Sequence, residues 1–315
     1  MTAYFDGANA TTTTSADAFV PEIWSDEIIA AYKKNLVAAN LVKKMNFKGK
    51  KGDTINIPTP TRGTANAKTA ATAVTIQAHT DSNTQVLINK HYEYSRLIED
   101  IVAAQALSSL RSFYTEDAGY ALGKQVDTDI IRLGRAINSG TGARYGHAYL
   151  GGDGTTAYDY SSNNETALTD AAIRRSIQRL DDADVPMDGR FFIIPPSSRN
   201  TLMGLSRYTE QAFTGESGGS NTIRNGLVGD LYGVSVYVSS NADTPNSADN
   251  GGGTDETSRV CLMAHKDAFV LVEQMGVRSQ TQYKQEFLAN LFTADTLYGV
   301  AELRDGAAVA LVVPA

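Results

Sequence analysis

Apolar residues recur along the chain with two different periods, and these periods predict a mixture of helices and strands. Residues 20–45 and 110–138 carry apolar residues every three or four positions, which is typical of helices with one buried face. In the longer segment the apolar stripe consists of Leu122, Val126, Ile130, Leu133 and Ile137. Residues 168–186 form a third amphipathic segment, where Thr169 or Asp170 is placed to cap the first turn.

Strands are indicated where apolar and polar residues alternate, or where β-branched and aromatic residues cluster. The runs of this kind are residues 52–58, 85–98, 190–196, 231–241, 259–265, 268–274 and 296–315. In the last run two apolar stretches flank Arg304-Asp305-Gly306, which predicts a β-hairpin. Ser197 or Ser198 is expected to cap a further helix. Because no parallel βαβ series is visible, the predicted fold class is α+β.

Residues 48–97 form an unusual excursion that leaves one strand and returns in another. The strand-like GDTINIP leads into TPTRGTANAKTAATA, which has almost no large apolar side chain, and the chain returns as QVLINKHYEYSRLI. We predict a long two-stranded ribbon, in which residues 53–76 could extend up to about 75 Å. An isolated two-stranded ribbon is marginally stable in water, so this ribbon needs a second surface, from its own domain or from a neighbouring molecule.

The first 20 residues are small, polar and rich in threonine, and alone they would be disordered. They nevertheless contain Tyr4, Phe5 and Phe19, which must find apolar surface elsewhere. We interpret this segment as an arm that becomes ordered on contact. It has no basic start and no apolar stretch, so we expect no signal peptide.

Composition argues against several classes of protein. The 28 Lys and Arg residues against 35 Asp and Glu give a net charge of −7, which does not suit a protein that mainly grips nucleic acid. No apolar run approaches the ~18–20 residues that span a bilayer, so we expect no membrane association. The single cysteine, Cys261, cannot form an internal disulfide and is expected to be buried as a small apolar residue.

No complete catalytic or ligand-binding motif occurs in the sequence. The histidines are far apart, and none stands in a zinc-binding pattern; they are His79, His91, His147 and His265. The glycines of residues 140–146 follow a predicted helix rather than a strand, so they do not fit a dinucleotide-binding loop. Neither a phosphate-binding loop nor a G-x-S-x-G elbow is present. We therefore expect no catalytic residue, cofactor or metal.

The order of parts, with FVPEIWS, KGDTINIP, VPMDGRFFIIPP and GLVGDLYGVSVYVSSN as its most specific stretches, resembles the major capsid proteins of tailed bacteriophages. These proteins have the HK97-like fold, and the resemblance is strongest to the T7-like and cyanophage type of podovirus. It covers essentially the whole chain. It implies five parts: an N-terminal arm and helix (1–47), an extended loop or E-loop (48–97), a peripheral domain with a spine helix (98–164), an axial domain (165–275) and a C-terminal return to the peripheral domain (276–315).

The resemblance also implies a function. Many copies of such a chain assemble as hexamers and pentamers into an icosahedral shell, which encloses double-stranded DNA without sequence-specific binding. The implied partners are a separate scaffolding protein, a portal protein and, in some relatives, a decoration protein. The implied location is the virion, after assembly in the cytoplasm of the host cell.

Contacts between subunits are expected at a few residues of the two protruding segments. In the N-terminal segment they are Tyr4, Phe5 and Trp24. Near the tip of the E-loop they are Arg62 and Lys68, whose cationic groups we expect to meet carboxylates of an adjacent subunit. No motif supports the covalent cross-link that some relatives form through an E-loop lysine.

Three other functions remain open at the level of sequence. The first is an encapsulin-like compartment shell, which has the same fold and a protein cargo. The second is a structural protein of a phage tail or fibre, although the long central helix argues against it. The third is a hydrolase without a recognisable motif.

Overall fold

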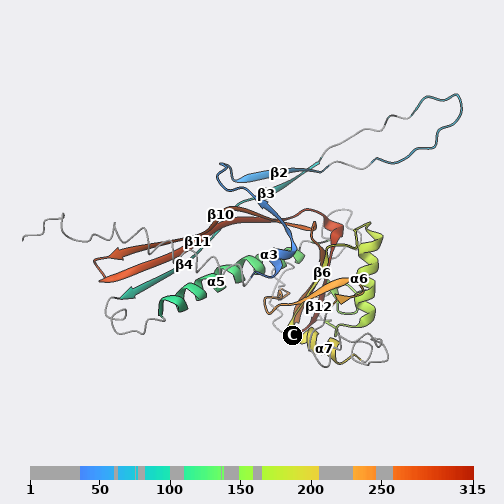
Figure 1. The fold of residues 1–315 in the computed structure, drawn as a ribbon. Helices are drawn as coiled ribbons and strands as arrows, with labels where there is room; N and C mark the ends of the chain where they lie inside the picture. The colour runs from blue at the N-terminus through green and yellow to red at the C-terminus, as the bar shows by residue number, and fades with distance from the viewer. Residues whose placement is uncertain are drawn as a thin grey trace, which may run out of the picture.

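Two β-sheets and a projecting ribbon form the framework of the protein (Figure 1). The structure is a computed structural model of the 315-residue chain. It describes residues 36–59, 63–74, 76, 82–99, 110–135, 137, 149–158, 165–205, 230–245 and 258–315.

The four-stranded sheet is long and has the strand order β1-β10-β11-β4. Its strands are β1 (Lys43–Asn46), β10 (Phe269–Lys284), β11 (Ala289–Glu302) and β4 (Lys90–Glu99). The 23-residue helix α5 (Leu110–Arg132) lies along one face of this sheet. Phe292, Ala294 and Tyr298 of β11 are buried on that face, and Tyr298 donates a hydrogen bond to Asp129 of α5.

The six-stranded sheet has the order β5-β12-β9-β6-β8-β7 and contains most of the main core. Its strands are β5 (Tyr149–Gly151), β12 (Ala308–Pro314), β9 (Ser258–His265), β6 (Arg190–Ile194), β8 (Val234–Val238) and β7 (Asp230–Leu231). Helix α6 (Asp170–Asp182) packs against it through Ile173 and Leu180, and α7 (Pro196–Met203) contacts β12.

The ribbon consists of β2 (Thr54–Thr59) and β3 (Ser82–Leu87), which pair in antiparallel register from Thr54–Leu87 to Thr59–Ser82. Figure 1 shows that it continues far beyond the two sheets. The predicted ribbon is therefore confirmed in its paired part. The predicted strand 85–98 is divided, because the chain leaves β3 at Leu87 and begins β4 at Lys90.

Several predicted helices are confirmed. Helix α5 and the 3₁₀ turn η1 (Leu133–Arg135) match the predicted helix, and the stripe residues Leu122, Val126 and Ile130 are buried. Thr169 caps α6 by accepting a hydrogen bond from the backbone N–H of Ala172.

Three local predictions are wrong. The predicted helix 20–45 lies mostly outside the described residues, and its end contains only the short α3 (Ala38–Leu41) before β1 begins. Pro195, rather than Ser197 or Ser198, occupies the N-cap position of α7, because the helix begins at Pro196 and both serines lie inside its first turn. Arg304–Gly306 does not form a hairpin, because β11 and β12 belong to different sheets.

The predicted C-terminal part, residues 276–315, is shared between the two sheets. Its first residue lies inside β10, which continues across the predicted boundary as one strand with register shifts near Met275. Strand β11 stays in the four-stranded sheet, whereas β12 pairs with β9 and β5 in the six-stranded sheet.

Buried Cys261 lies on β9 and has no exposed surface, as expected.

Candidate assembly surfaces

The root of the ribbon is held by a small core of its own. Val86 and Ile88 pack with Val270 and Val272 of β10, and partly buried apolar residues surround them. The side-chain amide of Gln274 donates to the carbonyls of Lys50 and Gly52, at 3.1 and 2.9 Å. The ribbon therefore leaves the four-stranded sheet from a fixed root.

The outer part of the ribbon has no such support. Every described residue between positions 63 and 76 is exposed, and Val74 and Ile76 keep 69% and 90% of their surface in solvent. The ammonium group of Lys68 donates to the backbone carbonyls of Thr69 and Thr72 in its own loop. Because a two-stranded ribbon is marginal alone, this exposed segment is a candidate contact surface.

The other predicted contact residues cannot be placed. Tyr4, Phe5, Trp24 and Arg62 lie outside the described residues. For Lys68 the structure gives an exposed position and contacts within its loop, and the predicted contact with a neighbouring carboxylate stays a prediction.

Asp127 of α5 fixes the point where the N-terminal segment enters the fold. Its carboxylate is buried and accepts hydrogen bonds from the backbone N–H groups of Val37 and Ala39, at 2.7 and 3.2 Å. Burial raises the pKa of Asp127, and these hydrogen bonds partly oppose the shift. No sequence motif marked this residue, since one aspartate in a helix is not distinctive.

Replacing Asp127 by Ala is expected to destabilise the protein by about 2 kcal/mol, because two backbone N–H groups lose their acceptor in a buried place. Denaturant unfolding of the variant measures this loss. Asp127→Asn is the matched control, since its amide oxygen still accepts one bond, and it should lose clearly less. Equal stability of Asp127→Ala and the native protein would contradict the assignment.

A charged network crosses the face of the four-stranded sheet opposite α5. Asp295 accepts two hydrogen bonds from Arg278, at 3.1 and 2.8 Å, and lies 3.1 Å from the Nε2 of His91. Burial acts to raise the pKa of Asp295, but the bonds from Arg278 and His91 outweigh it and leave the pKa below its usual value. This network joins β10, β11 and β4.

The Asp295 network is expected to stabilise the protein at neutral pH and to lose this contribution in acid. The pKa of Asp295 in the folded protein lies below its unfolded value of about 3.9. The stabilisation by Asp295 is therefore present above about pH 3.9 and is lost as pH falls through the folded pKa. Asp295→Asn should be less stable by about 1 kcal/mol at pH 7, after allowance for solvent screening, and equally stable near pH 2. Thermal unfolding at both pH values measures this, with Asp230→Asn, an exposed carboxylate, as control. An equal loss at both pH values would contradict it.

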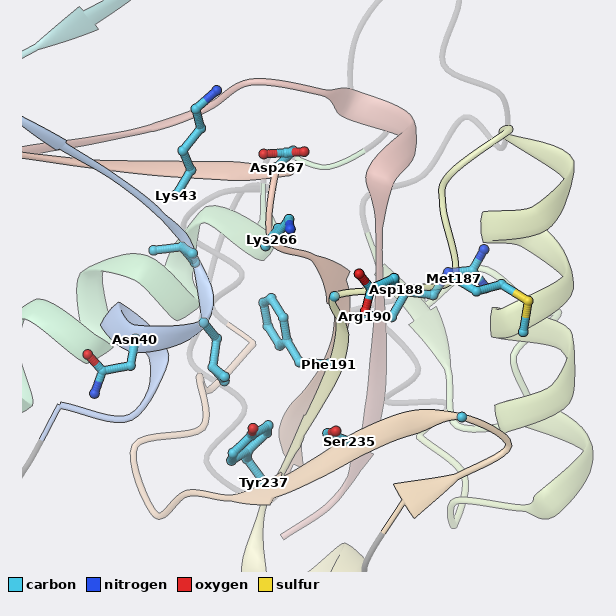
Figure 2. A pocket seen from close by; sticks show the side chains of 14 residues that line it. Asn40, Lys43, Met187, Asp188, Arg190, Phe191, Ser235, Tyr237, Lys266 and Asp267 are labelled. Atoms are coloured by element: carbon cyan, nitrogen blue, oxygen red, sulfur yellow. The ribbon is translucent and has the colours of Figure 1, made fainter.

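A cavity of about 530 Å³ lies where the N-terminal segment meets the six-stranded sheet. Figure 2 shows Phe191 in the middle, Tyr237 and Ser235 below it, and Lys43, Lys266 and Asp267 above it. The charged groups that line the cavity have both signs, so they do not point to one class of ligand. Within the described part of the chain, no group of three or more His, Cys, Asp or Glu side chains is arranged to hold a metal.

Comparison with known proteins identifies the family. The family model described as phage capsid protein matches residues 25–311, which is most of the chain. The chain belongs to the phage capsid protein family. It is a structural capsid protein, as the resemblance implied. No curated protein matches its sequence.

Solved capsid structures share its architecture. A chain from Mycobacterium phage Che8 is 22% identical, superposes with a TM-score of 0.66, and covers 88% of this chain and 90% of its own length. The capsid of cyanophage P-SCSP1u is 16% identical with a TM-score of 0.64, covering 87% and 86%. This likeness confirms the α+β, HK97-like fold of the capsid protein.

The comparisons also bear on the alternative functions, a compartment shell, a tail protein and a hydrolase. A virus-like particle from Pyrococcus furiosus has a related fold, with 10% identity, a TM-score of 0.56 and coverage of 93% of this chain and 99% of its own. The family match is to phage capsid proteins rather than to a compartment shell, a tail protein or a hydrolase. In the described part of the chain no helix is long and apolar enough to cross a membrane.

Proposed function

We propose that this capsid protein assembles as hexamers and pentamers into a closed icosahedral shell that encloses double-stranded phage DNA. The observation that supports the proposal most directly is the ribbon, whose outer part is fully exposed although its root is fixed. Stable assemblies bury about 2,000 Å² or more at each interface, and an extended ribbon supplies such area without a larger core.

In this proposal the ribbon lies over the neighbouring subunit, where Arg62 and Lys68 face carboxylates and Val74 and Ile76 find apolar contacts. The N-terminal segment, with Tyr4, Phe5 and Trp24, becomes ordered on a second subunit. The four-stranded sheet with α5 serves as the peripheral domain, and the six-stranded sheet serves as the axial domain at the centre of each capsomer.

The proposal also includes the partner proteins and the compartment in which the shell assembles. A separate scaffolding protein guides assembly in the host cytoplasm, a portal protein occupies one vertex, and a decoration protein binds some shells. The net charge of −7 suits an inner surface that does not hold DNA tightly. The protein has no catalytic role in this scheme.

Electron microscopy of the purified protein, alone and with a co-expressed scaffolding candidate, tests the proposal. Uniform closed shells of tens of nanometres are expected, and particles from infected cells should contain DNA. Shells from infected cells that contain protein cargo and no DNA would favour a compartment shell instead. A stable monomer under all conditions would contradict the proposal.

A further inference from the structure

Two short crossings join the two sheets and lie side by side. Residues 266–268 connect β9 to β10, and residues 303–307 connect β11 to β12. The backbone N–H groups of Leu303 and Arg304 both donate to the carbonyl of Ala268, at 2.8 and 3.4 Å. A change in the angle between the sheets therefore bends this hydrogen-bonded pair of segments.

Two carboxyl groups lie near the start of the second crossing. Glu302 is the last residue of β11 and is paired with the buried Phe269, and Asp305 begins the 3₁₀ turn η3 (Asp305–Ala307). Side chains two positions apart share one face of a strand, so Glu302 points to the same side as Val300, which packs on the main core. Its Oε1 atom is buried and has no hydrogen-bond partner among the described residues.

The ionisation of Glu302 is shifted into the neutral range. Burial raises the pKa of Glu302 to about 7, assisted by the negative charge of Asp305 and by the hydrogen bond between the two carboxyl groups. Such a bond between two carboxyl groups requires one shared proton. The pair therefore loses this proton within a physiological range of pH.

Other ionisable groups lie on the elements that meet here. The crossings carry Arg304, Lys266 and Asp267, and β9 ends in His265. Helix α6 contributes the acidic residues of its C-terminal end, since a Cβ atom on Gly306 would lie 3.6 Å from the Cβ of Ala183. These residues are Asp181 and Asp182 of the helix and Asp184 just after it, and Asp181 is bound to Arg190. The groups around the pair therefore carry both signs, and Asp305 is the one whose charge raises the pKa of Glu302.

We propose that the Glu302–Asp305 carboxyl pair is a proton-controlled lock on the connection between the two sheets. With one proton shared, the hydrogen bond between the carboxyl groups closes the turn from β11 into η3. When Glu302 releases this proton to water, two negative charges face each other and a buried oxygen stays without a donor. Residues 303–307 then open more readily, which loosens the bonds of Leu303 and Arg304 to Ala268.

His265 is another ionisable group beside these crossings, and its contacts differ from those of Glu302. Its Nδ1 accepts a hydrogen bond from the backbone N–H of Asp267, and its Nε2 lies 2.9 Å from the carbonyl of Asp188. The neutral ring protonated at Nε2 satisfies both contacts. The test must therefore distinguish an effect of Glu302 on the pH dependence from an effect of His265.

Hydrogen exchange of the full-length protein, measured by mass spectrometry between about pH 6 and pH 8.5, provides this test. After correction for intrinsic exchange, protection of residues 303–307 should fall roughly tenfold in the native protein as pH rises. Glu302→Gln keeps the shape and has no proton to release, so its protection should not change with pH. Light scattering verifies that the state of assembly is constant across the range.

Glu286→Gln is the matched control, because Glu286 is an exposed acid on the turn between β10 and β11. It should retain the pH dependence of the native protein. Asp305→Asn removes the neighbouring charge and carboxyl partner but leaves Glu302 buried, so it should weaken the dependence and shift it to lower pH. This second variant keeps the test valid if Glu302→Gln does not fold. An unchanged dependence in both Glu302→Gln and Asp305→Asn would overturn the proposal, as would its absence from the native protein.

Discussion

Removing the outer part of the ribbon is expected to leave the fold intact and to abolish shell assembly. Thr59 and Ser82 are paired across the ribbon, so an Asn-Gly turn that replaces residues 60–81 closes the hairpin directly. The root keeps its own core of Val86, Ile88, Val270 and Val272. The described residues that are removed are exposed, so the cost in folding stability should be below about 1 kcal/mol.

Shell assembly should be lost, because in the proposed function the exposed ribbon is the segment that lies over the neighbouring subunit. The yield of closed shells, measured by sedimentation and electron microscopy, should fall at least roughly tenfold. The thermal midpoint of the unassembled chain provides the folding control. A Val74→Ser, Ile76→Ser double variant keeps the length of the ribbon and should give an intermediate yield. Normal shells from the shortened chain would contradict the proposed role of the ribbon.

The features that sequence predicted best are those in which local pattern and tertiary environment agree. The apolar stripe of α5 is buried against the four-stranded sheet, and Leu122, Val126 and Ile130 each keep 3% or less of their surface exposed. The ribbon was predictable for the opposite reason, because residues without large apolar side chains have nothing to bury. In both cases composition over many residues decides the outcome.

The predicted hairpin at residues 304–306 failed because adjacent strands need not pair with each other. Strand β12 reads Ala-Val-Ala-Leu-Val-Val, and all six of these residues are buried, whereas β11 has several partly exposed positions. A continuous apolar run is typical of a strand inside a sheet that is covered on both faces. That difference between the two runs was the available signal that they belong to different sheets.

The candidate sites depended on contacts that no local pattern reveals. Asp127 meets backbone groups about ninety positions away, and Asp295 meets His91 over 204 positions. Each is an ordinary aspartate in the sequence. The predicted contact residues of the arm and ribbon concern contacts with other subunits, so they stay predictions.

Gly299→Ala is expected to destabilise the protein by about 3 kcal/mol or more. Gly299 lies on β11 beneath the chain that passes from β3 to β4, and a Cβ atom there would stand 2.4 Å from the carbonyl oxygen of Leu87 and 3.1 Å from the Cα of Ile88. Both contacts are with backbone atoms, which cannot rotate away. The added methyl group would therefore displace the root of the ribbon and disturb the small core around Val86.

Thermal and denaturant unfolding measure the loss, and the thermal midpoint should fall by about 5 °C or more. Gly276→Ala is the matched control in the neighbouring strand β10, where a Cβ atom would meet only the flexible end of the Lys48 side chain, at 3.1 Å. That variant should change stability by less than about 1 kcal/mol, because the lysine can move into solvent. Similar losses in the two variants would show that glycine in this sheet matters for strand conformation rather than for the close passage of the chain at Leu87. A loss confined to Gly299→Ala, with shells that are scarce even at temperatures where the chain is folded, would instead connect the position of the ribbon root to assembly.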